Sequence, residues 1–196
     1  MKFIEWMKLD LSDYLKINPI NLKYWWDRGD SLPTNEYSVY QLEQLTVSSK
    51  MDSYYVNLIN NSREVLDYSS TNVELNPSHI FTPYLPNLNS SYHDTEKDID
   101  ILFYGYLSPR RCEKIKELEQ TYKVHVTDNL TKIELSELIK KSKWVLSYGT
   151  WGNLHNDSFR TTPALNMGGN IMMERFSEEW YNEYLLDNFK DRIKLI

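Results

Sequence analysis

Two arginines follow a predicted strand and a glycine turn in the stretch DIDILFYGYLSPRR, which ends at Arg111. Its apolar residues predict a strand that stops before Gly105, and the Ser-Pro pair after it predicts the start of a helix. Free N–H groups and the positive end of the helix dipole meet at such a turn, so the turn favours an anion. Arg110 and Arg111 add guanidinium groups suited to phosphate. The stretch therefore predicts a site for a phosphate-bearing ligand.

A second group of candidate residues lies further along the chain, where Asp157 and Arg160 stand about one turn apart at the predicted start of a helix. The Asp157 carboxylate could accept hydrogen bonds from a ribose diol, or it could simply cap the helix. The Arg160 side chain could reach a diphosphate, or it could form an i,i+3 ion pair with Asp157. His155 belongs to the same loop. Glu174 ends the next predicted strand, where its carboxylate is either exposed or turned into a cleft.

Strands alternate with helices throughout the second half of the chain. This alternation predicts an α/β fold with a Rossmann-like parallel sheet and helices on both faces. Ligands of such sheets bind beyond the carboxyl ends of the strands, which is where Asp128 and both polar groups fall. Asp98 and Asp100 resemble a paired-acid metal motif, but they stand at the entry of their strand and so at the opposite edge. The predicted strands are 99–104, 123–127, 143–148 and 170–174, and the predicted helices are 109–121, 132–141, 158–166 and the region from 176 onward.

The first half of the chain gives weaker signals. Residues 1–15 predict an amphipathic helix, and the aromatic segment around Trp25 and Trp26 is irregular. The polar stretch NLNSSYHDTEK is typical of a linker. It divides the chain into a reduced N-terminal lobe, residues 1–94, and a C-terminal Rossmann-like lobe, residues 95–196. Other predicted elements are a strand over 37–42, a helix over 52–60, a strand over 65–68 and an extended segment over 79–86.

Composition excludes several classes of partner. The chain has 196 residues, a net charge of −6 and no basic block, so we expect no nucleic-acid partner. A single cysteine, Cys112, excludes an internal disulfide and fits a reducing compartment. No apolar run reaches membrane-spanning length and the N-terminus is not a signal peptide, so we expect a cytoplasmic protein without a membrane span. The histidines lack metal-binding spacing, and no dinucleotide or P-loop glycine motif is present.

Several stretches resemble one family. DIDILFYGYLSPRR is similar to the start of the donor-binding lobe in short glycosyltransferases of the two-Rossmann-lobe (GT-B) type, which occur in large DNA viruses, phages and bacteria. VLSYGTWGNLHNDSFRTTPALNMGGNIMME resembles the next signature of that group, with Asp157, Arg160, Gly168 and Glu174 in register. YQLEQL and VLDYSSTNVE, in the first half of the chain, resemble further blocks. The resemblance runs from about Tyr37 to Glu174.

This resemblance implies a GT-B-like fold with a reduced N-terminal lobe. It also implies transfer of a sugar from a nucleoside-diphosphate sugar to a hydroxyl of a glycan or glycoconjugate, without a metal ion or other cofactor. Glu43 and Asp67, at the ends of first-lobe strands, become candidate general bases. Each could equally be structural, Glu43 as a helix-start acid and Asp67 as a turn residue. The implied donor-binding residues are Gly105, Arg110, Arg111 and Arg160 at the diphosphate, Asp128 near the base, Asp157 at the ribose, Glu174 at the donor sugar and His155 in the adjoining loop. Glu174 could instead fix the neighbouring loop.

Departures from the family pattern keep other functions open. The family has Glu, His and an acid where this chain has Asp157, Gly149 and Pro163, and the chain is short for the fold. The short first lobe and Gly149 favour a non-catalytic nucleotide-sugar-binding module as the alternative. A third interpretation, a flavodoxin-like signalling domain, would place an acidic cluster where Gly105 stands. We further expect Arg111→Ala to remove diphosphate binding with little loss of fold stability, as a surface change would.

Overall fold

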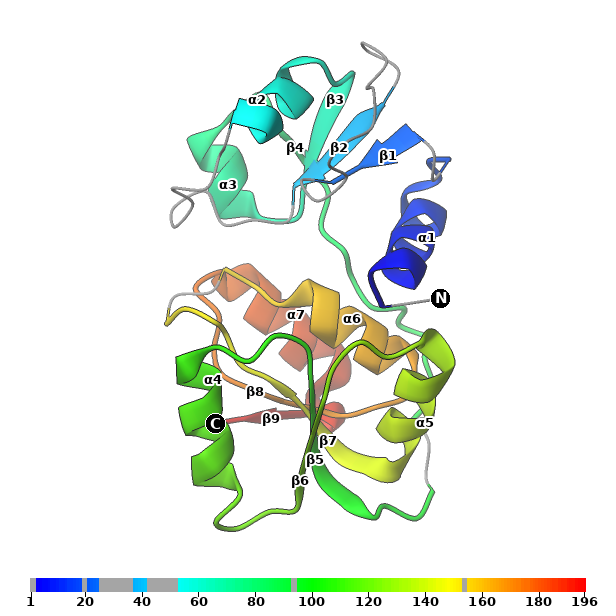
Figure 1. Ribbon diagram of the computed structural model, residues 1–196, viewed down its shortest axis with the longest axis vertical. Helices are drawn as coiled ribbons and strands as arrows, with labels where there is room; N and C mark the ends of the chain where they lie inside the picture. Colours follow the sequence, from blue (N-terminus) through cyan, green and yellow to red (C-terminus); the bar gives the residue numbers. More distant parts are fainter. Residues whose placement is uncertain (1–2, 19–20, 25–36, 42–52, 93–94, 153–154) are drawn as a thin grey trace. The chain divides into compact units, whose positions relative to one another are not determined.

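The structure is a computed structural model that describes residues 3–18, 21–24, 37–41, 53–92, 95–152 and 155–196. The chain forms two compact units. The smaller unit is Met7–Tyr84, and the larger unit joins Leu85–Ile196 to the first residues of the chain, Met1–Trp6. Each unit contains a parallel sheet flanked by helices (Figure 1). The expected mixed α/β architecture is therefore present in both units.

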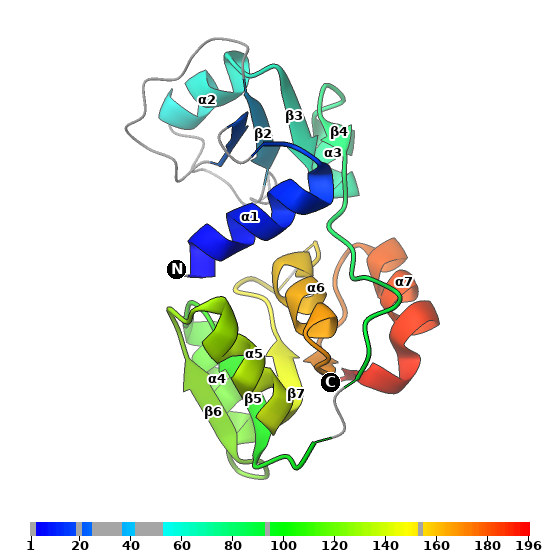
Figure 2. The same ribbon diagram turned by 90° about the vertical axis from the view of Figure 1, so that its right-hand side faces the viewer.

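The larger unit contains a five-stranded parallel sheet with the order β6-β5-β7-β8-β9. Figures 1 and 2 show α4 and α5 on opposite faces of this sheet. Helix α4 lies in the crossover from β5 to β6, and α5 lies in the crossover from β6 back to β7. These two right-handed crossovers run in opposite directions across the sheet, so they put their helices on opposite faces. The elements are β5 (Ile99–Tyr104), α4 (Pro109–Leu118), β6 (Val124–Thr127), α5 (Lys132–Lys141), β7 (Ser142–Ser147), α6 (Ser158–Asn166), β8 (Ile171–Met173), α7 (Glu179–Phe189), a 3-10 turn (Lys190–Arg192) and β9 (Ile193–Leu195).

Burial on both faces explains the apolar run of β5. Ile101, Leu102 and Phe103 are fully buried although neighbouring side chains of a strand point to opposite faces. Helix α4 then begins where the Ser108 side chain accepts a hydrogen bond from the Arg111 N–H, with Pro109 in its first turn. These two signals explain why strand, turn and helix follow one another so closely here.

The smaller unit contains a four-stranded parallel sheet with the order β1-β2-β3-β4. Its core includes Tyr37, Val39, Leu58 and Val65. Its strands are β1 (Leu22–Lys23), β2 (Ser38–Gln41), β3 (Glu64–Asp67) and β4 (Ile80–Phe81), and its helices are α2 (Ser53–Asn60) and α3 (Ser70–Leu75). Helix α1 (Phe3–Leu15) begins among the residues assigned to the larger unit and continues into the smaller one.

Most predicted elements are confirmed, several of them to the residue, as for β5, α5 and α6. Several short elements were missed. Strand β1 has only two residues, helix α3 has six, and β9 is a three-residue strand in a region for which the sequence predicted helix alone. All three are too short to show a periodic pattern. The aromatic segment around Trp25 and Trp26 and the candidate base Glu43 lie outside the described residues. Within the described part of the chain, no helix has the length and apolarity needed to cross a membrane.

Asp67 organises the turn between β3 and α3. Its carboxylate is fully buried and accepts hydrogen bonds from the Ser69 N–H (3.0 Å) and the Asn72 Nδ2 (3.1 Å). The His79 Nδ1 lies 2.9 Å from the other carboxylate oxygen. Burial raises the pKa of Asp67, and the hydrogen bond from His79 opposes that rise. These contacts fit the turn role that the sequence left open, while the catalytic role of Asp67 stays a prediction.

We expect Asp67→Ala to lower the free energy of unfolding by about 3 kcal/mol, because it leaves three buried donors without their acceptor. Urea denaturation measures the change. Glu74→Ala, at an exposed position of the same helix α3, is the matched control and should change little. Equal stability of the two variants would contradict the role assigned to the Asp67 carboxylate.

Candidate anion-binding site

The turn after β5 requires a glycine. Gly105 has a φ of +108°, a conformation that other residues rarely adopt. A Cβ atom added there would lie 3.3 Å from Nη2 of Arg160, so the position also keeps room for that guanidinium. The Gly105 N–H is bonded to the Thr127 carbonyl oxygen (3.1 Å), which anchors the turn to the end of β6. The backbone therefore passes close to Arg160 at the carboxyl edge of the sheet.

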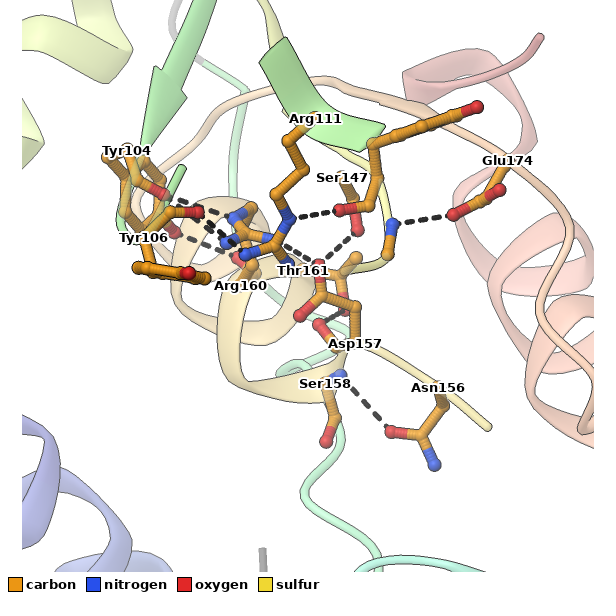
Figure 3. Close-up of polar contacts among 12 residues, drawn as sticks. Tyr104, Tyr106, Arg111, Ser147, Asn156, Asp157, Ser158, Arg160, Thr161 and Glu174 are labelled. Atoms are coloured by element: carbon orange, nitrogen blue, oxygen red, sulfur yellow. Dashed lines mark hydrogen bonds and ion pairs between the residues drawn. The ribbon is translucent and has the colours of Figure 1, made fainter. Parts of the chain in front are cut away.

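Arg111 is the most unusual cation at this edge. Its side chain is buried, with 7% of the residue exposed. Nε donates to the Tyr148 carbonyl oxygen (2.7 Å). Nη1 donates to the Tyr106 carbonyl oxygen (2.9 Å), and Figure 3 shows Arg111 beside Tyr106. Among the described residues, Arg111 forms no ion pair with a carboxylate. Its positive charge is thus held by neutral oxygen atoms from the loops after β5 and β7.

Burial lowers the pKa of Arg111 to about 10, and the nearby charge of Arg160 contributes to the shift. The group still carries its proton at neutral pH. We expected Arg111 to be a surface side chain, and this prediction is wrong. The small loss of stability expected on its removal rested on that exposure, so we now expect a larger loss. A buried guanidinium that satisfies two loop carbonyls also supports the fold.

Arg160 and Asp157 form the i,i+3 ion pair that the sequence offered as one alternative. The same Asp157 oxygen accepts a hydrogen bond from Ser147 Oγ (2.6 Å) at the end of β7. Asp157 is the N-cap residue of α6, but its side chain makes no capping hydrogen bond. Arg160 also donates to the Tyr104 carbonyl oxygen (3.3 Å) and is buried, with 8% of the residue exposed. Figure 3 shows these contacts gathered beside Arg111. The ribose-binding role of Asp157 stays a prediction.

The two buried guanidinium groups approach the same aromatic ring. The Cζ atoms of Arg111 and Arg160 lie 5.6 and 5.1 Å from the centre of the Phe103 ring. Asp157 forms its ion pair with Arg160, so the two guanidinium groups together carry an excess of positive charge. Like charges in a site with little water repel each other, and an incoming anion would relieve this repulsion. The cluster is therefore suited to bind an anionic group.

Arg110 and Glu174 hold the start of the loop after β7. Arg110 Nη1 and Nη2 lie 2.9 and 2.5 Å from the two carboxylate oxygens of Glu174. Glu174 also accepts the Gly149 N–H (2.5 Å), and Arg110 donates to the Gly149 carbonyl oxygen (2.9 Å). The hydrogen bond to Glu174 raises the pKa of Arg110. Here the two side chains contact each other and the loop backbone, which fits the alternative that Glu174 fixes the neighbouring loop. The contacts of Arg110 and Glu174 with a donor stay predictions.

The remaining predicted residues lie in different surroundings. His155 is buried, with 3% exposed, and its carbonyl oxygen accepts the Glu178 N–H (3.1 Å). Asp128 is exposed after β6. Sequence reasoning missed Ser147, the hydroxyl group that holds Asp157. The available signal was its position: Ser147 is a polar residue at the end of the strand SKWVLS, and the carboxyl ends of the strands form the edge where such sheets bind ligands.

Comparisons with known proteins give one distant relative. No protein-family model matches the chain. Over 133 residues the chain is 29% identical to "Uncharacterized protein L138" of Acanthamoeba polyphaga mimivirus, an alignment that covers 63% of this chain and 13% of that protein. The chain thus matches only a small part of the length of this viral relative. These findings assign the chain to no family, so the glycosyltransferase resemblance stays a hypothesis.

We expect Gly105→Ala to lower the free energy of unfolding by about 1–2 kcal/mol, because alanine is strained at positive φ and its Cβ presses on Arg160. Gly152→Ala is the matched control, since a Cβ there meets nothing within 4 Å. Chemical denaturation of both variants measures the difference. Equal stability of the two variants would show that the turn tolerates a side chain.

Proposed function

We propose that the larger unit binds a nucleoside-diphosphate sugar and that the protein transfers the sugar to a hydroxyl acceptor. The observation that carries the proposal is the pair of buried guanidinium groups of Arg111 and Arg160, of which Arg160 alone forms an ion pair with Asp157. They lie at the carboxyl edge of a parallel α/β sheet, where such folds bind their ligands. The resemblance to the donor-binding lobe of GT-B glycosyltransferases supplies the reaction.

Sugar transfer requires stabilisation of a departing diphosphate. Charge develops on this leaving group as the bond to the anomeric carbon breaks, and fixed positive groups lower the barrier by meeting that charge. Arg111 and Arg160 are held in place by backbone oxygens and by Asp157, so they need little rearrangement to do this. In the proposed mechanism these guanidinium groups perform the charge neutralisation that a divalent cation performs in other transferases.

The burial of Asp67 favours a second candidate function. A general base must reach the hydroxyl that it deprotonates, and the Asp67 carboxylate is fully buried with three donors around it. Glu43, the other candidate base, lies outside the described residues. This second candidate is a nucleotide-sugar-binding module without turnover, which would need the anion-binding arginines but no general base. Binding and turnover must therefore be tested separately.

We expect calorimetry to detect binding of UDP or GDP, and Arg111→Lys to weaken it at least tenfold. Lysine keeps the charge but loses the flat fork that can bind two oxygens at once. Arg111→Ala should abolish binding and also lower the free energy of unfolding by about 2 kcal/mol, because two loop carbonyls lose their donor.

Lys143→Ala is the control for these binding measurements. It removes one positive charge from the start of β7, at the opposite edge of the same sheet, where the side chain is 54% exposed. Its affinity for the nucleotide should equal that of the wild type. Unaltered binding by folded Arg111→Lys and Arg111→Ala would contradict the proposed site.

Release of nucleoside diphosphate separates the two candidate functions. We expect the wild type to release it from one member of a panel of nucleotide sugars, and faster when a glycan acceptor is present. Arg160→Lys should slow this release, because it weakens the charge that meets the leaving group. Nucleotide-sugar binding without any release would select the binding module instead.

A further inference from the structure

Two aromatic side chains at the carboxyl edge of the larger sheet are left open to solvent. Tyr106, after β5, is 71% exposed, and Trp151, after β7, is 50% exposed. A single exposed aromatic residue is common on protein surfaces and needs no explanation. Tyr106 and Trp151 are unusual because hydrogen bonds from arginine side chains hold the loops that carry them.

Each ring belongs to a loop that an arginine side chain holds by a hydrogen bond. The Tyr106 carbonyl oxygen accepts a hydrogen bond from Arg111 (2.9 Å). Trp151 stands two residues after Gly149, whose N–H is bonded to Glu174 and whose carbonyl oxygen is bonded to Arg110. The backbone is thus held at Tyr106 and at the start of the loop that carries Trp151, although both rings are exposed. A ligand that stacks on these rings would find part of the ordering already complete.

Both rings belong to the surroundings of the same buried cation. Strands β5 and β7 are parallel neighbours, so the loops that follow them leave the sheet at the same edge. Arg111 joins these loops directly, because it binds the carbonyl oxygen of Tyr106 in one and that of Tyr148 in the other (Figure 3). A phosphate group bound by Arg111 would therefore bring any ring attached to it close to the loops that carry Tyr106 and Trp151.

We propose that Tyr106 and Trp151 stack on the nucleobase of the ligand whose phosphates bind Arg111 and Arg160. The proposal rests on the proposed function and adds to it the part of the ligand that these loops recognise. Aromatic side chains stack on every base, and each such contact contributes a measurable share of nucleotide affinity. The rings would thus bind a nucleotide more tightly than the phosphate groups alone.

The test compares a nucleotide with its phosphate part. UDP, GDP and ADP are titrated into the wild-type chain by calorimetry, and the tightest of them is compared with inorganic pyrophosphate. Tyr106→Ala and Trp151→Ala should each weaken nucleotide binding about tenfold and leave pyrophosphate binding unchanged. Tyr106→Phe and Trp151→Phe should restore nucleotide affinity, because they restore a stacking ring.

Tyr92→Ala is the control, since Tyr92 is 43% exposed but lies before β5, away from the loops that follow the strands. Unchanged nucleotide affinity in both alanine variants would overturn the proposal. An equal loss for pyrophosphate would also overturn it, because the variants would then have displaced the anion site. Glucose 1-phosphate is titrated in the same way. A loss of affinity confined to this ligand would overturn the proposal and assign the rings to a sugar. A wild-type chain that binds neither nucleotide nor pyrophosphate would refute the proposed function itself.

Discussion

The guanidinium group of Arg111 holds together two loops that are distant in the sequence. It donates to the carbonyl oxygens of Tyr106 and Tyr148, and it stays buried without an ion pair among the described residues. A buried charge satisfied by neutral oxygens is less stable than one with a carboxylate partner. The loops after β5 and β7 therefore depend on a cation that still attracts negative charge.

The neighbouring charges perform a different task. Arg110 is paired with Glu174 and Arg160 with Asp157, so each of these cations has its carboxylate. The first pair holds Gly149 at the start of a loop, and the second joins α6 to the end of β7 through Ser147. Such pairs position backbone and side chains without adding net charge. Arg111 also holds backbone, but unlike Arg110 and Arg160 it has no carboxylate partner among the described residues, so it carries the excess positive charge.

Local sequence signals predicted the elements better than the contacts of the site. The apolar run of β5 and the Ser-Pro start of α4 are short-range patterns, and they located strand, turn and helix. The burial of Arg111 could not be predicted, because one of its two backbone partners, the Tyr148 carbonyl oxygen, belongs to a loop that is distant in the sequence. The pairing of Arg110 with Glu174 likewise joins residues that only the folded sheet brings together. Asp67 shows the same limit, since its turn contacts were foreseeable but its bond with His79 was not.

The order of the strands has a consequence for how this protein could acquire new ligands. The chain leaves β5 toward β6 and later returns to its other side with β7, so the connections after β5 and β7 diverge from each other. This divergence follows from the strand order, whereas the hydrogen bonds of Arg111 hold the two loops where they leave the sheet. Substitutions at the exposed tips could therefore alter ligand preference during evolution while the buried framework beneath them stays intact.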